Sequence, residues 1–105
     1  MGISSVRVMN RLSQAKPATD LSDEGLTISS SAVAFADVAA AAPYVYVTID
    51  GADVRCTFDG SAPTGANGHF LGDGYQDLWS RELFNASRFI RDAAVDAYGH
   101  ATPMG

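Results

Sequence analysis

One cysteine, two histidines and a set of aspartates are the residues of this chain whose side chains could do chemistry. Cys56 and His69 offer a thiol and an imidazole, the groups of a nucleophile and its base. Cys56 alternates with apolar residues, however, so its side chain is predicted to point into a core. The chain has neither a Gly-x-Ser-x-Gly motif nor a glycine-rich phosphate loop. We therefore expect the protein not to be an enzyme.

Metal binding is not predicted either. His69 and His100 fall in separate predicted strands, and neither His-x-x-x-His nor Cys-x-x-Cys occurs. Five aspartates lie in or next to predicted turns: Asp50, Asp53, Asp59, Asp73 and Asp77. They lack the alternating spacing, ending in a bidentate Glu, that a calcium loop requires. Aspartate often stabilises turns by bonding to its own backbone, and that role accounts for most of them. We expect no metal and no cofactor.

Aromatic side chains are a better lead to function. An exposed ring can stack on a sugar or anchor a protein interface. The candidates for an outer face or for loops are Tyr44, Tyr46, Tyr75 and Trp79. The same rings would also suit the edge of the core, and at this point both interpretations stay open.

The elements that position these residues are clearest between Tyr44 and Thr64. The first run, Tyr44–Ile49, is β-branched or aromatic, and Asp50-Gly-Ala-Asp is a turn signal. The pattern predicts a β-hairpin with a strand on either side of this turn. Because side chains alternate along a strand, one core face is predicted. It comprises Val45, Val47, Ile49, Val54, Cys56 and Phe58.

Further strands are predicted at 27–33, 69–71, 76–80, 87–92 and 95–101, with a loop at 34–43. Turn signals recur every 8–12 residues or so, which is typical of a sandwich or barrel. Residues 80–97 also fit a helix, with Leu83, Phe84, Ile90 and Ala94 near helical spacing, but we predict strand there. The fold class is therefore all-β. We predict a small antiparallel β-sandwich, immunoglobulin-like or jelly-roll-like, over residues 28–105.

Residues 1–27 are predicted to form an extended basic N-terminal arm. Before Asp20 there are three cations, Arg7, Arg11 and Lys16, and no acid, whereas the rest of the chain has four cations and all 12 acids. Such an asymmetry favours contact with an acidic surface, for example a neighbouring copy, although a solvated tail is the alternative. The acidic body argues against nucleic acid as a partner. No apolar run is long enough to span a membrane, and no secretory signal is recognised.

A family resemblance adds to these observations. The run Val-Thr-Ile-Asp-Gly-Ala-Asp-Val-Arg-Cys-Thr-Phe-Asp-Gly-Ser-Ala-Pro-Thr, followed by Gly-His-Phe-Leu at 68–71 and Phe-Ile-Arg at 89–91, resembles small structural virion proteins of tailed bacteriophages. The resemblance covers residues 28–101. It departs from the family pattern at Cys56, where tyrosine is usual, and in a closing strand with few β-branched residues.

The resemblance implies a non-enzymatic virion protein that decorates or cements the capsid, or that sits at the head-to-tail or tail region. Its implied partners are the major capsid protein, other virion proteins and copies of itself, and its implied location is the virion, assembled in the host cytoplasm. The turn Asp-Gly-Ser-Ala-Pro-Thr at 59–64 also resembles one in immunoglobulin-like accessory modules of chitin-active enzymes. The alternative function is therefore a carbohydrate-binding accessory module, with Trp79 as a stacking residue.

Overall fold

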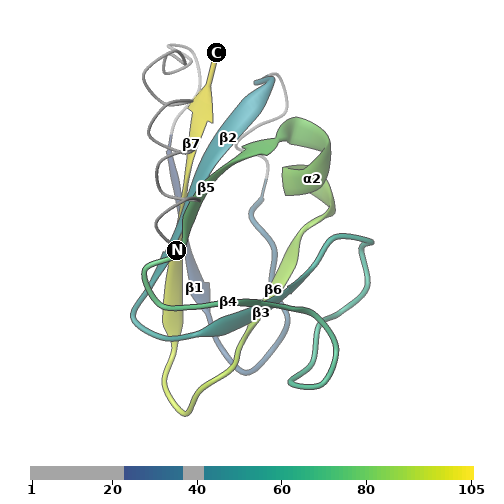
Figure 1. Ribbon diagram of the computed structural model, residues 1–105, viewed down its shortest axis with the longest axis vertical. Coiled ribbons are helices and arrows are strands. Elements are labelled where there is room, and N and C mark those ends of the chain that lie inside the picture. Colours follow the sequence, from purple (N-terminus) through teal and green to yellow (C-terminus); the bar gives the residue numbers. More distant parts are fainter. Residues whose placement is uncertain (1–22, 37–41) are drawn as a thin grey trace.

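Seven strands and one short helix make up the part of the chain that the structure, a computed structural model, describes: residues 23–36 and 42–105. The elements are β1 (Glu24–Ile28), β2 (Tyr44–Asp50), β3 (Val54–Thr57), β4 (His69–Leu71), β5 (Gln76–Ser80), α2 (Arg81–Ala86), β6 (Arg88–Arg91) and β7 (Ala97–Met104). They form one sheet in the order β1-β7-β2-β5 and another in the order β4-β3-β6. Every pairing is antiparallel. The two sheets lie in separate layers (Figure 1), which confirms the predicted small all-β sandwich.

The core lies between the sheets. On β2, Val45, Val47 and Ile49 are buried, and the side chains between them are not. Val54 and Cys56 of β3 are also fully buried, as predicted from their alternation. Phe58, the last member of the predicted core face, is half-buried and packs against the cluster.

The predicted hairpin between β2 and β3 is wrong, although both strands exist. β2 pairs with β5 and β7, whereas β3 pairs with β4 and β6, so the turn carries the chain from one sheet to the other. The Asp73 carboxylate accepts from the Gly51 amide at 3.0 Å, and the Asp53 carboxylate accepts from the Asp73 amide at 2.8 Å. The two apolar faces therefore meet across the core instead of lying side by side in one sheet.

β7 is a central strand with an unusually small inner face. Ala97 and Ala101 are fully buried, and Gly99 lies between them on the same face. A Cβ atom at Gly99 would lie 3.0 Å from the Phe35 Cζ and 3.5 Å from the Ile28 Cδ1. The small residues of β7 thus leave the space that larger side chains of other elements fill.

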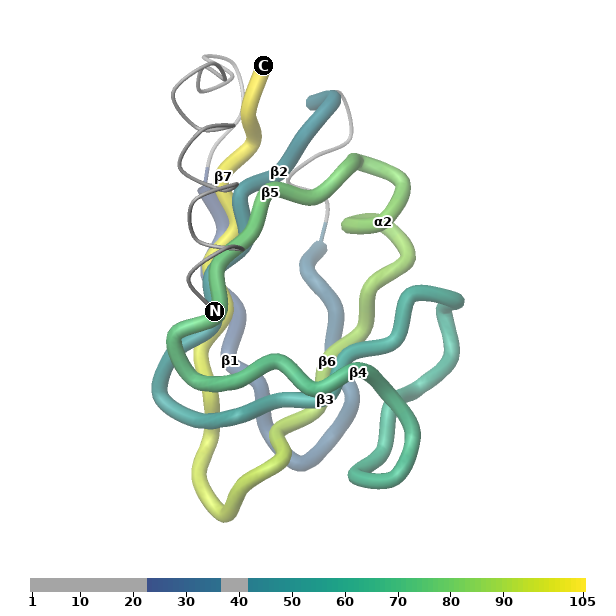
Figure 2. The backbone as a smooth tube through the Cα atoms, in the orientation of Figure 1, coloured from purple at the N-terminus to yellow at the C-terminus, as the bar shows by residue number. Residues whose placement is uncertain are grey.

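Two further segments differ from the sequence prediction. The first strand is Glu24–Ile28, earlier than the predicted 27–33, so residues 24–27 of the predicted arm pair with β7. The strand prediction for 80–97 is right at 88–91 and wrong at 81–86, where Ser80 caps α2 by accepting from the Leu83 amide. As Figure 2 shows, α2 lies on the path from β5 in one sheet to β6 in the other.

The arm predictions at Arg7, Arg11 and Lys16 lie outside the described residues, as do residues 37–41 of the predicted loop at 34–43. Within the described part of the chain, no helix is both long enough and apolar enough to cross a membrane.

Candidate functional site

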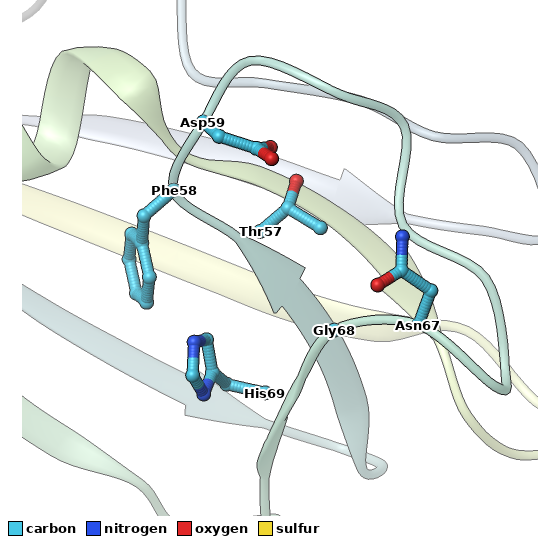
Figure 3. Close-up of a pocket in the computed structure, with 6 residues that line it drawn as sticks. All are labelled: Thr57, Phe58, Asp59, Asn67, Gly68 and His69. Carbon is cyan, nitrogen blue, oxygen red and sulfur yellow. The ribbon is translucent and has the colours of Figure 1, made fainter.

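A pocket of about 410 Å³ opens where β3 ends and β4 begins. Its lining residues are Thr57, Phe58, Asp59, Asn67, Gly68 and His69. In Figure 3 the rings of Phe58 and His69 lie on one side, and Thr57, Asp59 and Asn67 lie on the other. The two ring centroids are 5.5 Å apart and the rings are tilted by 36°. In this pocket several polar side chains and an imidazole come together.

Two polar side chains of the pocket, those of Thr57 and Asp59, are hydrogen-bonded within the loop that follows β3. The Thr57 hydroxyl donates to the Ser61 carbonyl at 2.5 Å. The Asp59 carboxylate accepts from the Ser61 hydroxyl at 2.6 Å and from the Ser61 amide at 3.0 Å. These bonds to the charged carboxylate lower the pKa of Asp59. Asp59 therefore acts as a turn-stabilising anion, as predicted for the turn aspartates, and is unsuited to take up a proton at neutral pH.

Cys56 and His69 are Cα partners across β3 and β4, which places a thiol and an imidazole in register. The thiol is nevertheless fully buried, and its Sγ donates to the Thr57 carbonyl at 3.6 Å. Burial raises the pKa of Cys56 from its ordinary 9.0 to about 12. Since the thiolate is the nucleophile and the thiol is not, this pair does not carry nucleophilic chemistry near neutral pH.

We expect the free energy of unfolding to fall as the pH rises from about 9 towards 12. The pKa values of Cys56 and Tyr75 are both raised to about 12 in the folded protein, so the unfolded chain loses these protons first. Their contribution is complete below about pH 9 and declines by up to about 1.4 kcal/mol per pH unit for each group. Urea titrations of the protein and of Cys56→Ala from pH 7 to 11 measure the slope. An equal alkaline slope in the two proteins would contradict the role of Cys56.

His100 and three further acids, Asp23, Asp53 and Asp73, have structural partners. The His100 Nε2 lies 3.2 Å from the Asp23 Oδ2. Asp53 and Asp73 hold the turns beside β2 through backbone amides, as described above. The described residues contain no group of three or more His, Cys, Asp or Glu side chains that could hold a metal ion.

The four predicted interface aromatics separate into different environments. Tyr44 lies on the outer face of the four-stranded sheet and is 48% exposed. Tyr46 is half-buried on the same face, and its hydroxyl donates to the Gln76 side-chain oxygen. Tyr75 is half-buried and packs against the core. Of the four, Tyr44 is the one with an exposed ring.

The prediction that Trp79 offers a stacking surface is wrong. The Trp79 side chain is 3% exposed and points inward, in register with Val45. Its indole stacks on Phe89 at 6.0 Å and contacts Phe58 edge to face at 5.1 Å. Its Nε1 donates to the Tyr75 hydroxyl at 2.9 Å, which satisfies the buried donor. Trp79 is therefore part of the core.

Two exposed aromatics were missed by the sequence analysis. Tyr98 and Phe70 are each 54% exposed. Tyr98 lines an outer-face groove of about 520 Å³ together with Thr48, Asp50 and His100. The Arg55 guanidinium lies 5.3 Å from the centre of the Phe70 ring, on the outer face of the other sheet. The signal for Tyr98 was its alternation with the small residues of β7.

Comparisons of the chain with protein-family models, with curated proteins and with solved structures gave no significant match. The chemistry of the site therefore has to be judged from its own geometry. The thiol is buried, the pocket aspartate is bonded to its turn, and the His69 ring packs on Phe58. Exposed aromatic rings, by contrast, lie on the outer faces of both sheets. The arrangement suits contact with other macromolecules.

Proposed function

We propose that this protein is a non-enzymatic structural component of a tailed-bacteriophage virion that decorates or cements the capsid through contacts with neighbouring subunits. The observation that carries the proposal is the exposure of aromatic rings on opposite sides of the sandwich. Tyr44 and Tyr98 lie on the outer face of the four-stranded sheet, and Phe70 lies on the outer face of the three-stranded sheet. A protein that joins two neighbours needs a contact surface on each side.

The composition of these surfaces supports an interface. Aromatic residues and arginine are enriched in protein–protein interfaces, and Phe70 is already paired with Arg55. Arg55 is held in turn by Asp92, with 3.1 Å between Nε and Oδ2, and donates to the Gly68 carbonyl at 3.4 Å. Because the Phe70 ring already contacts a guanidinium that other residues hold in place, it loses little side-chain entropy when a partner binds. The sequence resemblance to small virion proteins supports the same class of partner.

The charge distribution supports contacts with acidic neighbours. Three cations and no acid precede Asp20, whereas the chain as a whole has a formal net charge of −5. Complementary charge raises the association rate and selects partners more than it raises affinity. The proposed partners are the major capsid protein, other virion proteins and further copies of this chain.

The proposal predicts that reversing the basic charge prevents incorporation into particles. The full-length variant Arg7→Glu, Arg11→Glu, Lys16→Glu is expected to be lost from purified virions, because three attractive contacts become repulsive. Quantitative mass spectrometry of gradient-purified particles measures its copy number against the parent protein. The matched control, Arg7→Lys with Arg11→Lys, keeps the charge and should be incorporated normally. Undiminished incorporation of the reversed variant would overturn the role of the basic segment, and the absence of the parent protein from virions would overturn the proposed function itself.

A further inference from the structure

The loop between β6 and β7 presents apolar side chains to solvent. Ala93, Ala94 and Val95 are consecutive and exposed, and Val95 is 59% exposed. This loop projects from one end of the sandwich, at the bottom of the view in Figure 1. Three exposed apolar residues in a row are disfavoured on a protein surface unless they have a function. We call these three residues the apolar tip.

The loop that carries the apolar tip is held at both ends. The Arg91 Nη1 donates to the Asp96 Oδ1 at 2.5 Å, so an ion pair joins the two flanks of the loop. The Asp92 amide donates to the Asp53 carbonyl at 2.8 Å, and the Asp92 carboxylate accepts from the Arg55 Nε at 3.1 Å. Because its base is fixed in this way, the tip loses little conformational entropy when a partner binds.

Carboxylates gather around the base of the apolar tip. The Gly51 amide donates to the Asp73 carboxylate, and a Cβ atom at Gly51 would lie 3.5 Å from the Asp96 carbonyl oxygen. The Asp53 carboxylate accepts from the Asp73 amide, which ties the turns beside β2 and β5 together. Asp50 precedes Gly51 and is exposed, as is Asp73. We call five residues the acidic rim: Asp50, Asp53, Asp73, Asp92 and Asp96.

The charge of this end of the sandwich selects the kind of partner. Arg55 pairs with Asp92, and Arg91 pairs with Asp96. Five aspartates and two arginines leave a formal net charge of −3 around the tip. An apolar tip within an anionic rim fits a socket that is apolar at its centre and lined at its edge by lysine or arginine. The same charge disfavours insertion into an anionic membrane surface.

A second copy of the chain fits that description less well. Among the described residues, Arg55 and Arg91 already hold carboxylates of their own acidic rim. Arg88 donates to the Gly60 carbonyl at 3.3 Å, and Arg81 lies 3.8 Å from the carboxylate of the adjacent glutamate. The arginines of the described residues thus all have partners within the chain. A socket with a basic edge is therefore expected on a different protein.

We propose that the apolar tip inserts into an apolar socket with a basic edge on a different virion protein. This inference rests on the proposed function and adds the chemistry of one contact to it. Burial of the Val95 side chain supplies affinity, and the acidic rim orients the partner. Because the rim is charged and lies at the surface, the affinity is expected to fall as the salt concentration rises.

Site-specific photo-cross-linking in particles tests this contact. The photoreactive residue p-benzoylphenylalanine replaces Val95, or Ala66 as an exposed control in the loop before β4. Virions that contain either full-length variant are purified and irradiated, and the linked peptides are identified by mass spectrometry. Position 95 is expected to link to a peptide of another virion protein in which apolar residues lie beside lysine or arginine, and position 66 is not expected to link to that peptide.

The other outcomes of the cross-linking experiment are decisive as well. A link from position 95 to a second copy of this chain would overturn the proposal, as would the same peptide from both positions. Particles that contain the protein but give no link from position 95 would also overturn it. Absence of the parent protein from virions would instead overturn the proposed function, and this inference with it.

Matched serine variants give an independent readout. Val95→Ser shortens the apolar tip, whereas Leu83→Ser changes a leucine of α2 that is 36% exposed. Fluorescently labelled full-length protein is titrated against purified particles that lack it. Binding is expected to weaken about ten-fold or more in Val95→Ser, since the burial of one valine is lost, and to stay unchanged in Leu83→Ser. The urea midpoint of Val95→Ser is expected to match that of the parent protein, because the residue is exposed.

The same titration separates failure of this inference from failure of the proposed function. Equal affinities of Val95→Ser and the parent protein would overturn the inference and leave the virion role intact. No binding by the parent protein would count against the virion role itself. The double variant Asp50→Asn, Asp73→Asn removes two charges of the acidic rim, and its affinity is expected to depend less on salt than that of the parent protein. An equal salt dependence would overturn the part assigned to the rim.

Discussion

Replacing Phe89 by alanine is expected to lower the free energy of unfolding by about 3–5 kcal/mol. Phe89 is fully buried on β6 of the three-stranded sheet, and its ring contacts Trp79 of the other sheet and Phe35 in the segment between β1 and β2. It stacks on Trp79 of β5 with 6.0 Å between the ring centroids and 6° between the planes. It also meets Phe35 edge to face at 5.6 Å. Truncation removes both ring contacts and leaves a cavity between the two layers.

The measurement is a urea or guanidinium titration of the full-length variant. A small domain typically has about 5–15 kcal/mol of stability in total, so the expected loss is a large share of it. Phe70→Ala is the matched control, because Phe70 is 54% exposed and contributes chiefly its contact with Arg55. The control is expected to lose no more than about 1 kcal/mol. A loss below about 1 kcal/mol in Phe89→Ala as well would show that the core is not arranged around this ring.

The faces of the strands were predictable from sequence, whereas their partners were not. Alternation along β2 and β3 correctly placed Val45, Val47, Ile49, Val54 and Cys56 in the core. The same alternation holds whether the two strands pair in one sheet or face each other across the core. Pairing depends on contacts between residues distant in sequence, such as β2 with β7, and a local pattern carries no information about those.

Side-chain size does not identify the inward face of a strand that packs against bulky neighbours. On β7 the inward positions are small, because Phe35 and Ile28 fill the space beside Gly99, and the large Tyr98 points outward. On β5, Leu78 and Trp79 point to opposite faces. Both are buried, however, so apolarity alone did not identify the core side.

The helix α2 depends on tertiary contacts as well as on its cap. Its sequence has one capping serine, Ser80, and a length at which an isolated helix does not form in water. What holds it is Phe84, which is 4% exposed and lies 5.2 Å from the Phe35 ring. Residues 80–97 therefore contain a short helix followed by the strand β6. Neither the helical nor the strand pattern extends over the whole stretch.

The sharpest distinction between structural and ligand-binding roles comes from Trp79. If Trp79 stacked on a sugar, Trp79→Ala would abolish binding while the fold and its stability were retained. The buried indole instead predicts a loss of about 3–5 kcal/mol, measurable as a lower denaturation midpoint. The exposed ring of Tyr44 supplies the comparison, because Tyr44→Ala is expected to change stability far less.

The conservative variant Trp79→Phe separates the two contributions of the indole. Phenylalanine keeps a ring against Phe89 but removes the Nε1 donor, so the Tyr75 hydroxyl loses its 2.9 Å hydrogen bond. We expect this variant to recover most of the stability lost in Trp79→Ala, with a remaining deficit of about 0.5–1.5 kcal/mol for the hydrogen bond and a further part for lost volume. An unchanged midpoint in Trp79→Ala would instead mean that the indole is not packed in the core, and a surface role in ligand binding would again have to be considered.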